Sequence, residues 1–221
     1  MAPSYAEAQR HFEAVLSAKR AHFGNSDNAS AASTHIQLGR VLSLQRHFAA
    51  AEEHYGAAVR LCAKHLGEAH PNTACALTDL AAVLREQGAF EAAEGYARRA
   101  VASLQAGVGP ADVSTATALY NLAGLAKRQG KWEGAERAYG EALAIFKAKL
   151  GMGAGETADT LYQMGCLHKK RAAVAAAAEI FAQAADAYAA CYGEGDRRVG
   201  EARKRARDMA EKMARSTVSR R

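Results

Sequence analysis

The sequence predicts an all-α protein, an α-solenoid in which helix–turn–helix hairpins stack on one another. Three observations predict this fold class. About a quarter of the 221 residues are alanine and only three are proline, which favours helices because alanine loses no side-chain entropy on ordering. Equivalent side chains recur along the chain with a 42-residue period. Within each repeat, a short turn separates two stretches that carry apolar residues at helical spacing.

The repeat is clearest at the residues that begin the second helix of each hairpin. Phe48, Phe90 and Trp132 are spaced by one full period, Val174 continues the series, and Tyr5 precedes Phe48 by one position more than a period. One hairpin cannot bury its apolar face alone, so the hairpins are expected to stack. Two further columns keep the same period, an alanine three positions after each of these residues and a glycine that closes each repeat: Ala8, Ala51, Ala93, Ala135 and Ala177, and Gly24, Gly67, Gly109, Gly151 and Gly193.

These columns predict one solenoid domain over residues 4–214, followed by a basic disordered tail at residues 215–221. A partial repeat at residues 4–24 supplies a second helix without its first. A capping helix at residues 196–214 ends the stack, with an Arg- and Lys-rich outer face that suits exposure to solvent. The complete hairpins between them are expected at residues 28–67, 71–109, 112–151 and 156–193.

Two packing features are expected inside this domain. The capping helix should bury one apolar stripe, and small residues of each first helix should meet the alanines of its second helix so that the two backbones approach closely. The expected stripe is Val199, Ala202, Ala206 and Met209, and the small residues are Gly39, Ala81, Ala123 and Gly165.

The repeat resembles the tetratricopeptide repeat (TPR), in its longer, kinesin-light-chain-like form with a 42-residue period. The motifs that carry the resemblance are His70-Pro71-Asn72-Thr73-Ala74, Leu119-Tyr120-Asn121-Leu122-Ala123 and Gln129-Gly130-Lys131-Trp132-Glu133. It covers nearly the whole chain. The resemblance implies a right-handed superhelix whose first helices line a concave groove, and it implies a non-enzymatic adaptor or scaffold that binds a partner protein there.

The resemblance also assigns a polar column to the groove, one residue per first helix. The family uses an asparagine at this position to hydrogen-bond the backbone of an extended peptide, and Asn121 matches it directly. Gln37, Asp79 and Gln163 occupy the same position in the other hairpins and match more loosely. The alternative is that these residues are polar only because the position is exposed.

Basic residues follow the polar column six and seven positions later, which predicts a positive strip beside the groove that favours acidic partners. Kinesin-light-chain-like grooves take acidic, aromatic-containing peptides, so an acidic peptide is the ligand that the resemblance implies. Ordinary solvated charge is the alternative. Tyr120 and Tyr162 either contact the ligand or pack between repeats. The candidate peptide-binding residues are Gln37, Arg40, Asp79, Arg85, Asn121, Lys127, Arg128, Gln163, Lys169 and Lys170.

The basic character of the chain is concentrated at its end. Residues 197–221 contain ten Lys or Arg against three acidic residues, whereas the rest is close to neutral. A second hypothesis is therefore that the protein is a structural subunit of a cytoskeletal, ciliary or ribonucleoprotein assembly, anchored by this basic helix. Binding of a polyanion such as nucleic acid is a third reading, and the lack of interleaved aromatic residues argues against recognition of bases.

No catalytic or metal-binding signature occurs. Gly151-Met152-Gly153-Ala154-Gly155 lacks the Gly-Lys-Ser/Thr of a phosphate-binding loop and falls at a repeat boundary. His65 and His70 do not have the i, i+4 spacing of a helical metal pair. We therefore expect no enzymatic activity, no metal and no cofactor.

The cysteines and the apolar runs bear on location. The four cysteines form no Cys-x-x-Cys motif, which favours free thiols in a reducing compartment. The sequence contains no run of eighteen apolar residues, the length that a membrane-spanning helix needs, and residues 1–10 lack the apolar core of a signal peptide. We expect a cytoplasmic protein, with the cytoskeleton or a cilium as an alternative place of association.

Overall fold

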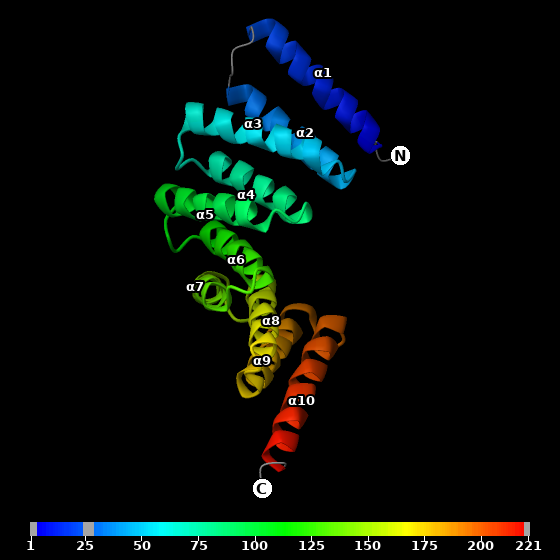
Figure 1. Ribbon diagram of the computed structural model, residues 1–221, viewed down its shortest axis with the longest axis vertical. Coiled ribbons are helices and arrows are strands. Elements are labelled where there is room, and N and C mark those ends of the chain that lie inside the picture. Colours follow the sequence, from blue (N-terminus) through cyan, green and yellow to red (C-terminus); the bar gives the residue numbers. More distant parts are fainter. Residues whose placement is uncertain (1–3, 24–28, 219–221) are drawn as a thin grey trace. The chain divides into compact units, whose positions relative to one another are not determined.

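A computed structural model of the chain describes residues 4–23 and 29–218, and within these ranges it contains ten α-helices and no β-strand (Figure 1). The predicted all-α fold class is confirmed. The chain divides into two compact units, Met1–Pro110 and Ala111–Arg221, so a single continuous solenoid stays a prediction. The helices are α1 (Tyr5–Phe23), α2 (Ala29–Leu44), α3 (Phe48–Leu66), α4 (Pro71–Glu86), α5 (Phe90–Gly107), α6 (Val113–Arg128), α7 (Trp132–Leu150), α8 (Gly155–Lys170), α9 (Val174–Tyr192) and α10 (Arg197–Val218).

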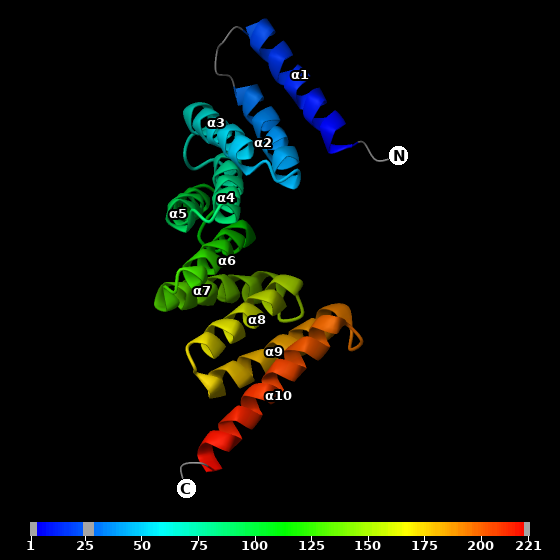
Figure 2. The same cartoon turned by 45° about the vertical axis from the view of Figure 1, so that its right-hand side comes forward.

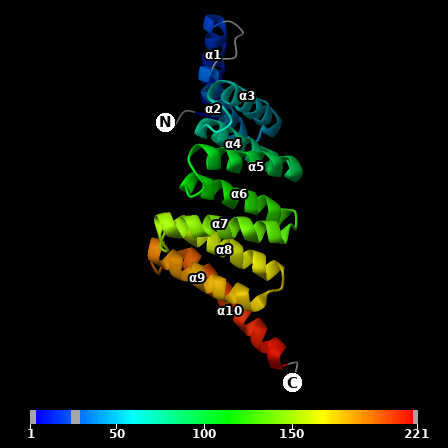
Figure 3. The ribbon, with the colours of Figure 1, turned by 90° about the vertical axis from the view of Figure 1, so that its left-hand side faces the viewer.

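The first unit contains α1 and two helical hairpins. α2 packs against α3 and α4 packs against α5, while α1 lies on α2 and α3 lies on α4 (Figure 3). Ala51 and Ala93, from the alanine column, are fully buried. Tyr55 and Leu77 fill the space between the helices around them. Gly24, the glycine expected to close the partial repeat, lies outside the described residues.

The second unit contains two hairpins and one further helix. α6 packs against α7 and α8 against α9, α7 lies on α8, and α10 lies along α9 (Figure 2). Ala135 and Ala177 are again fully buried. The large side chains at the centre of this unit are Tyr139, Phe146 and Phe181, each 2% exposed or less. Each hairpin therefore buries its apolar side against a neighbour, as the repeat pattern predicts.

Local signals fix where two of the first helices begin. His70 caps α4, since its Nδ1 accepts a hydrogen bond of 3.1 Å from the backbone N–H of Asn72, and Pro71 occupies the first turn, where no N–H partner is needed. Asp112 caps α6 by accepting a 2.8 Å hydrogen bond from the backbone N–H of Ser114. The hairpin boundaries predicted from the sequence fall within a few residues of these starts.

The turn inside each hairpin requires a left-handed backbone. Gly88 and Gly130 have φ of 82° and 74° at this position. Arg46 and Ala172 occupy the same position in the other two hairpins, with φ of 63° and 59°. Residues with a Cβ incur a steric penalty in this conformation, so these two turns carry strain that the glycine turns do not.

Two of the small residues of the first helices, both glycines, make room for aromatic rings of the second helix. A Cβ on Gly39 would lie 2.9 Å from the ring of Tyr55, and a Cβ on Gly165 would lie 2.7 Å from the ring of Phe181. The ring is thus the nearest group at these two hairpins, and the expected contact with alanine stays a prediction. Because glycine has no side chain, the ring of the second helix lies directly against the backbone of the first helix.

Polar side chains at the turns join successive hairpins within each unit. Gln87 Nε2, after α4, donates a 2.9 Å hydrogen bond to Glu52 Oε2 of α3. In the second unit Arg171, after α8, pairs with Glu136 of α7. Glu52 and Glu136 are separated by two repeat periods, so the same contact is built twice.

α10 buries the expected stripe but extends farther than expected. Val199, Ala202 and Met209 are buried and Ala206 is half-buried. The helix was expected to end at residue 214 and instead continues to Val218, beyond the end of α9 (Figures 2 and 3). No glycine or proline occurs in residues 210–218, and Arg215 pairs with Glu211 one turn earlier, so nothing local ends the helix sooner. Residues 219–221 of the expected tail lie outside the described residues.

Candidate peptide-binding groove

The groove face of the first unit is held together by an ion pair between two first helices. Arg40 of α2 donates to Asp79 Oδ2 of α4 from Nε at 3.2 Å and from Nη2 at 3.1 Å. Nη2 also lies 3.6 Å from the sulfur of Cys75. Burial raises the pKa of Asp79 and the guanidinium of Arg40 opposes that rise. Two of the predicted groove residues therefore bind each other.

The rest of the first unit contributes little positive charge. Arg85 Nη2 lies 2.9 Å from Glu86 Oε1, so its charge is also paired. Gln37 is exposed, and Leu44 presents an apolar side chain that is 61% exposed. The structure thus does not concentrate cations on the groove face of α2 and α4.

The second unit differs because three of its predicted groove cations lack acidic partners. Arg128 of α6 and Lys169 and Lys170 of α8 are exposed, and none of the three forms an ion pair with a described residue. Lys127 is half-buried: its Nζ donates to Gln163 Oε1 of α8 and lies 5.6 Å from the centre of the Tyr139 ring. Burial lowers the pKa of Lys127, and the charges of Lys170 and Arg128 lower it further.

The two rows of basic residues do not share one face. A helix turns about 100° per residue, so a residue seven positions after the polar column returns to its direction, whereas one six positions after it points about 120° away. Arg128 and Lys170 come seven positions after Asn121 and Gln163, so they point in the same direction as these residues. Lys127 belongs to the second kind, which is why it reaches the ring of Tyr139 in its own hairpin.

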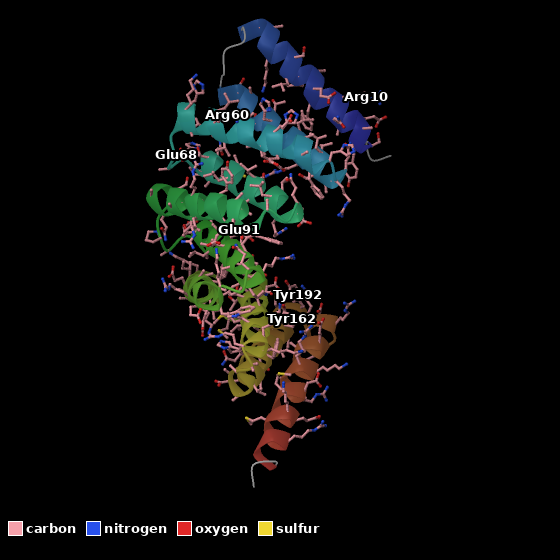
Figure 4. The ribbon with its side chains drawn as sticks, in the orientation of Figure 1. Arg10, Arg60, Glu68, Glu91, Tyr162 and Tyr192 are labelled. Atoms are coloured by element: carbon pink, nitrogen blue, oxygen red, sulfur yellow. The ribbon has the colours of Figure 1, made fainter. Side chains whose placement is uncertain are left out.

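The two tyrosines pack inside the second unit. The ring of Tyr120 meets Tyr139 edge-on, with 5.6 Å between centroids. Tyr162, labelled on α8 in Figure 4, meets Phe181 edge-on at 5.5 Å. Its hydroxyl donates a 2.6 Å hydrogen bond to Glu201 Oε1 of α10. Both rings therefore have partners within the fold, and packing between helices is the reading that the structure supports.

Sequence reasoning missed the groove face of α10, because it treated this helix only as a cap. Arg205 follows Gln163 by one full repeat period, and Lys212 follows Lys170 by the same period. Arg205 Nη1 lies 3.8 Å from the sulfur of Cys166, and its guanidinium carbon lies 5.1 Å from the centre of the Tyr162 ring. Extending the 42-residue period by one more repeat would have found both residues.

Three comparisons with known proteins bear on this arrangement. Residues 30–106 and 114–190 match the tetratricopeptide repeat family model. The chain belongs to the tetratricopeptide repeat family. TPR units are generally scaffolds for protein–protein interaction. A search of the curated proteins found no match.

Solved TPR structures share the fold of this chain. BtubC (BKLC) from P. vanneervenii aligns with a TM-score of 0.67 at 18% identity, over 96% of this chain and 93% of that one. A putative kinesin light chain from Podosopora anserina with nearly identical TPR-like repeats aligns with a TM-score of 0.72 at 20% identity, over 84% of this chain and 87% of that one. A variant of the same putative kinesin light chain aligns with a TM-score of 0.73 at 20% identity, over 84% and 87%. The chain therefore shares its fold with kinesin-light-chain-like TPR structures.

Other kinds of site receive no support from the described part of the chain. No group of three or more His, Cys, Asp or Glu residues there could hold a metal ion. No described helix is both long and apolar enough to cross a membrane. The glycine-rich segment around Gly153 connects α7 to α8, at the repeat boundary where the sequence placed it. All four cysteines are free thiols in the structure.

Proposed function

We propose that this TPR protein is a non-enzymatic adaptor or scaffold that binds an acidic peptide segment of a partner protein. The binding surface is the groove face of α6 and α8 in the second unit. The protein acts in the cytoplasm, where association with the cytoskeleton is one setting for such an adaptor.

One observation supports the acidic character of the partner above all others. Arg128 and Lys170, at equivalent positions on neighbouring first helices, have no acidic partner among the described residues, and their charges add to burial in lowering the pKa of Lys127. Repulsion within such a group is relieved by carboxylates from outside, and the attraction also speeds the encounter of the two proteins. Asn121, half-buried beside this cluster, suits hydrogen bonding to the backbone of the bound segment.

Charge reversal tests this proposal. Arg128→Glu and Lys170→Glu together should weaken binding of a fluorescein-labelled, glutamate-rich peptide at least tenfold at low salt. The control reverses charges on the exposed side of α7, at Arg137 and Lys149. Circular dichroism should show unchanged helicity in both variants. Equal peptide affinity for the double variant and the wild type would refute the groove assignment.

A structural subunit of a larger assembly, anchored by α10, is the second candidate. It rests on Arg197, Lys204 and Arg207, which are exposed and form no ion pair within the described residues. Removing α10 would uncover apolar surface of α9, so reversing these three charges is the cleaner test. Retention on heparin that depends on these three residues would favour this candidate, or a polyanion ligand, over the groove.

A further inference from the structure

The strongest unassigned feature is the side of α10 that continues the groove face. α10 repeats the register of α6 and α8, because its buried residues fall at equivalent positions. Thr115, Thr157 and Val199, at the start of the three helices, are all fully buried. Leu125, Leu167 and Met209, ten positions later, are buried as well. α10 is therefore the first helix of a fifth repeat, and it presents equivalent positions in equivalent directions.

Side-chain interactions join α6 to α8 and α8 to α10, so the three helices are neighbours along the groove face. Lys127 of α6 bonds to Gln163 of α8. Tyr162 of α8 donates its hydroxyl proton to Glu201 of α10, and Arg205 of α10 reaches back to Cys166 of α8. The groove face thus continues from α6 through α8 to α10 within the second unit.

The residue thirteen positions after each of the buried starting residues is basic in all three helices. These residues are Arg128, Lys170 and Lys212, which we call the cation column. All three are exposed, and none forms an ion pair within residues 111–218 of the structure. The first unit has Leu44 and Glu86 at the same position. The column therefore belongs to the second unit alone.

The opposite side of α10 is unlike that of the other first helices. Where Gly39 and Gly165 admit an aromatic ring of a second helix, α10 has Arg207, which is exposed. No second helix could approach as closely there. α10 thus ends the hairpin stack on one side and remains available as a groove helix on the other.

We propose that Arg128, Lys170 and Lys212 bind three carboxylates spaced at least three residues apart in an extended acidic segment of the partner. The inference rests on the proposed function and adds the third helix and the spacing. Helices that pack directly on one another lie roughly 8–10 Å apart. α6, α8 and α10 pack mainly on α7 and α9, so neighbouring members of the cation column lie at least that far apart. A polyproline II chain rises about 3.1 Å per residue with three residues per turn, so every third side chain points the same way at roughly 9 Å intervals. Three residues are therefore the shortest spacing at which such a segment places one carboxylate at each helix, and contiguous carboxylates are too close together.

A peptide ruler tests the spacing. A labelled peptide with the sequence Glu-Pro-Pro-Glu-Pro-Pro-Glu should bind the full chain at least fivefold more tightly than a peptide of equal composition with its three glutamates contiguous, measured by fluorescence anisotropy at low salt. Equal affinity of the two peptides would overturn the spacing and leave only general charge attraction.

The role of α10 is tested by Lys212→Glu, with Arg207→Glu on the opposite side of the same helix as the matched control. Lys212→Glu should weaken binding of the ruler peptide about fivefold, and Arg207→Glu should change it less than twofold. Replacing the glutamate that meets Lys212 by glutamine should remove the difference between wild type and Lys212→Glu.

The outcomes separate the two proposals. Loss of affinity in Arg128→Glu and Lys170→Glu with none in Lys212→Glu would overturn the role of α10 and retain the groove. Equal losses in Lys212→Glu and Arg207→Glu would also overturn it, because position on the helix would not matter. No loss in any of the three groove variants would overturn the proposed function itself.

Discussion

The hydroxyl of Tyr162 on α8 donates a 2.6 Å hydrogen bond to the carboxylate of Glu201 on α10. The same carboxylate accepts a 3.0 Å hydrogen bond from Arg205, whose guanidinium lies over the Tyr162 ring. This small network fixes α10 at the register that places Lys212 on the groove face. It connects the stability of the second unit with the surface proposed to bind the partner.

Removing this hydroxyl should weaken the second unit without changing its packing. Tyr162→Phe should lower the free energy of unfolding by about 1 kcal/mol, the usual net value of such a hydrogen bond. Chemical denaturation followed by circular dichroism measures the loss. Tyr5→Phe is the control, since Tyr5 is 54% exposed and its replacement should have no effect. Equal stabilities of Tyr162→Phe and the wild type would contradict the network.

A methyl group should not fit between α8 and α9 at Gly165. A Cβ there would lie 2.7 Å from the ring of Phe181, so Gly165→Ala should destabilise the protein by about 1–3 kcal/mol. Gly140→Ala is the matched control, because nothing lies within 4 Å of a Cβ at that helical position and alanine should stabilise the helix by roughly 0.5–1 kcal/mol. The melting temperature should therefore fall in Gly165→Ala and rise in Gly140→Ala, relative to the wild type.

The strained turn between α8 and α9 offers a stabilising substitution. Ala172 has φ of 59°, so Ala172→Gly should raise the free energy of unfolding by about 1 kcal/mol. Gly130→Ala, at the equivalent turn with φ of 74°, should lower it by a similar amount. A decrease in stability on Ala172→Gly would mean that the turn carries no steric strain.

The start of α10 should be sensitive to acid. The side chain and backbone N–H of Arg198 bond to Asp196 and hold the pKa of this carboxyl at about 2. A carboxyl whose folded pKa lies below its unfolded value stabilises the fold above the unfolded value, about 3.9, and this stability is lost as the pH falls toward 2. Asp196→Asn should therefore flatten the decline in melting temperature between pH 4 and pH 2 relative to the wild type. An unchanged decline would show that Asp196 is not responsible.

The sequence predicts the repeat and its buried columns well, because burial in a stacked hairpin follows local periodicity. Ala51, Ala93, Ala135 and Ala177 are all fully buried, as their 42-residue spacing indicates. The helix of the cap is also predicted, with its stripe at Val199, Ala202 and Met209. The candidate groove is predicted less completely: the basic residues of α6 and α8 are found, while Lys212 on α10 is missed.

The composition and period of the sequence by themselves determined an all-helical repeat protein, because helix propensity and apolar spacing act over a few neighbouring residues. Only the tertiary structure decided which polar side chains bind one another. Arg40 bonds to Asp79 and Lys127 bonds to Gln163, each across nearly a full repeat of sequence. Which side chains meet depends on how far each helix is rotated about its own axis in the packed structure. That rotation depends on the fit of Tyr55 over Gly39 and of Phe181 over Gly165 across the hairpin, which no single stretch of sequence contains.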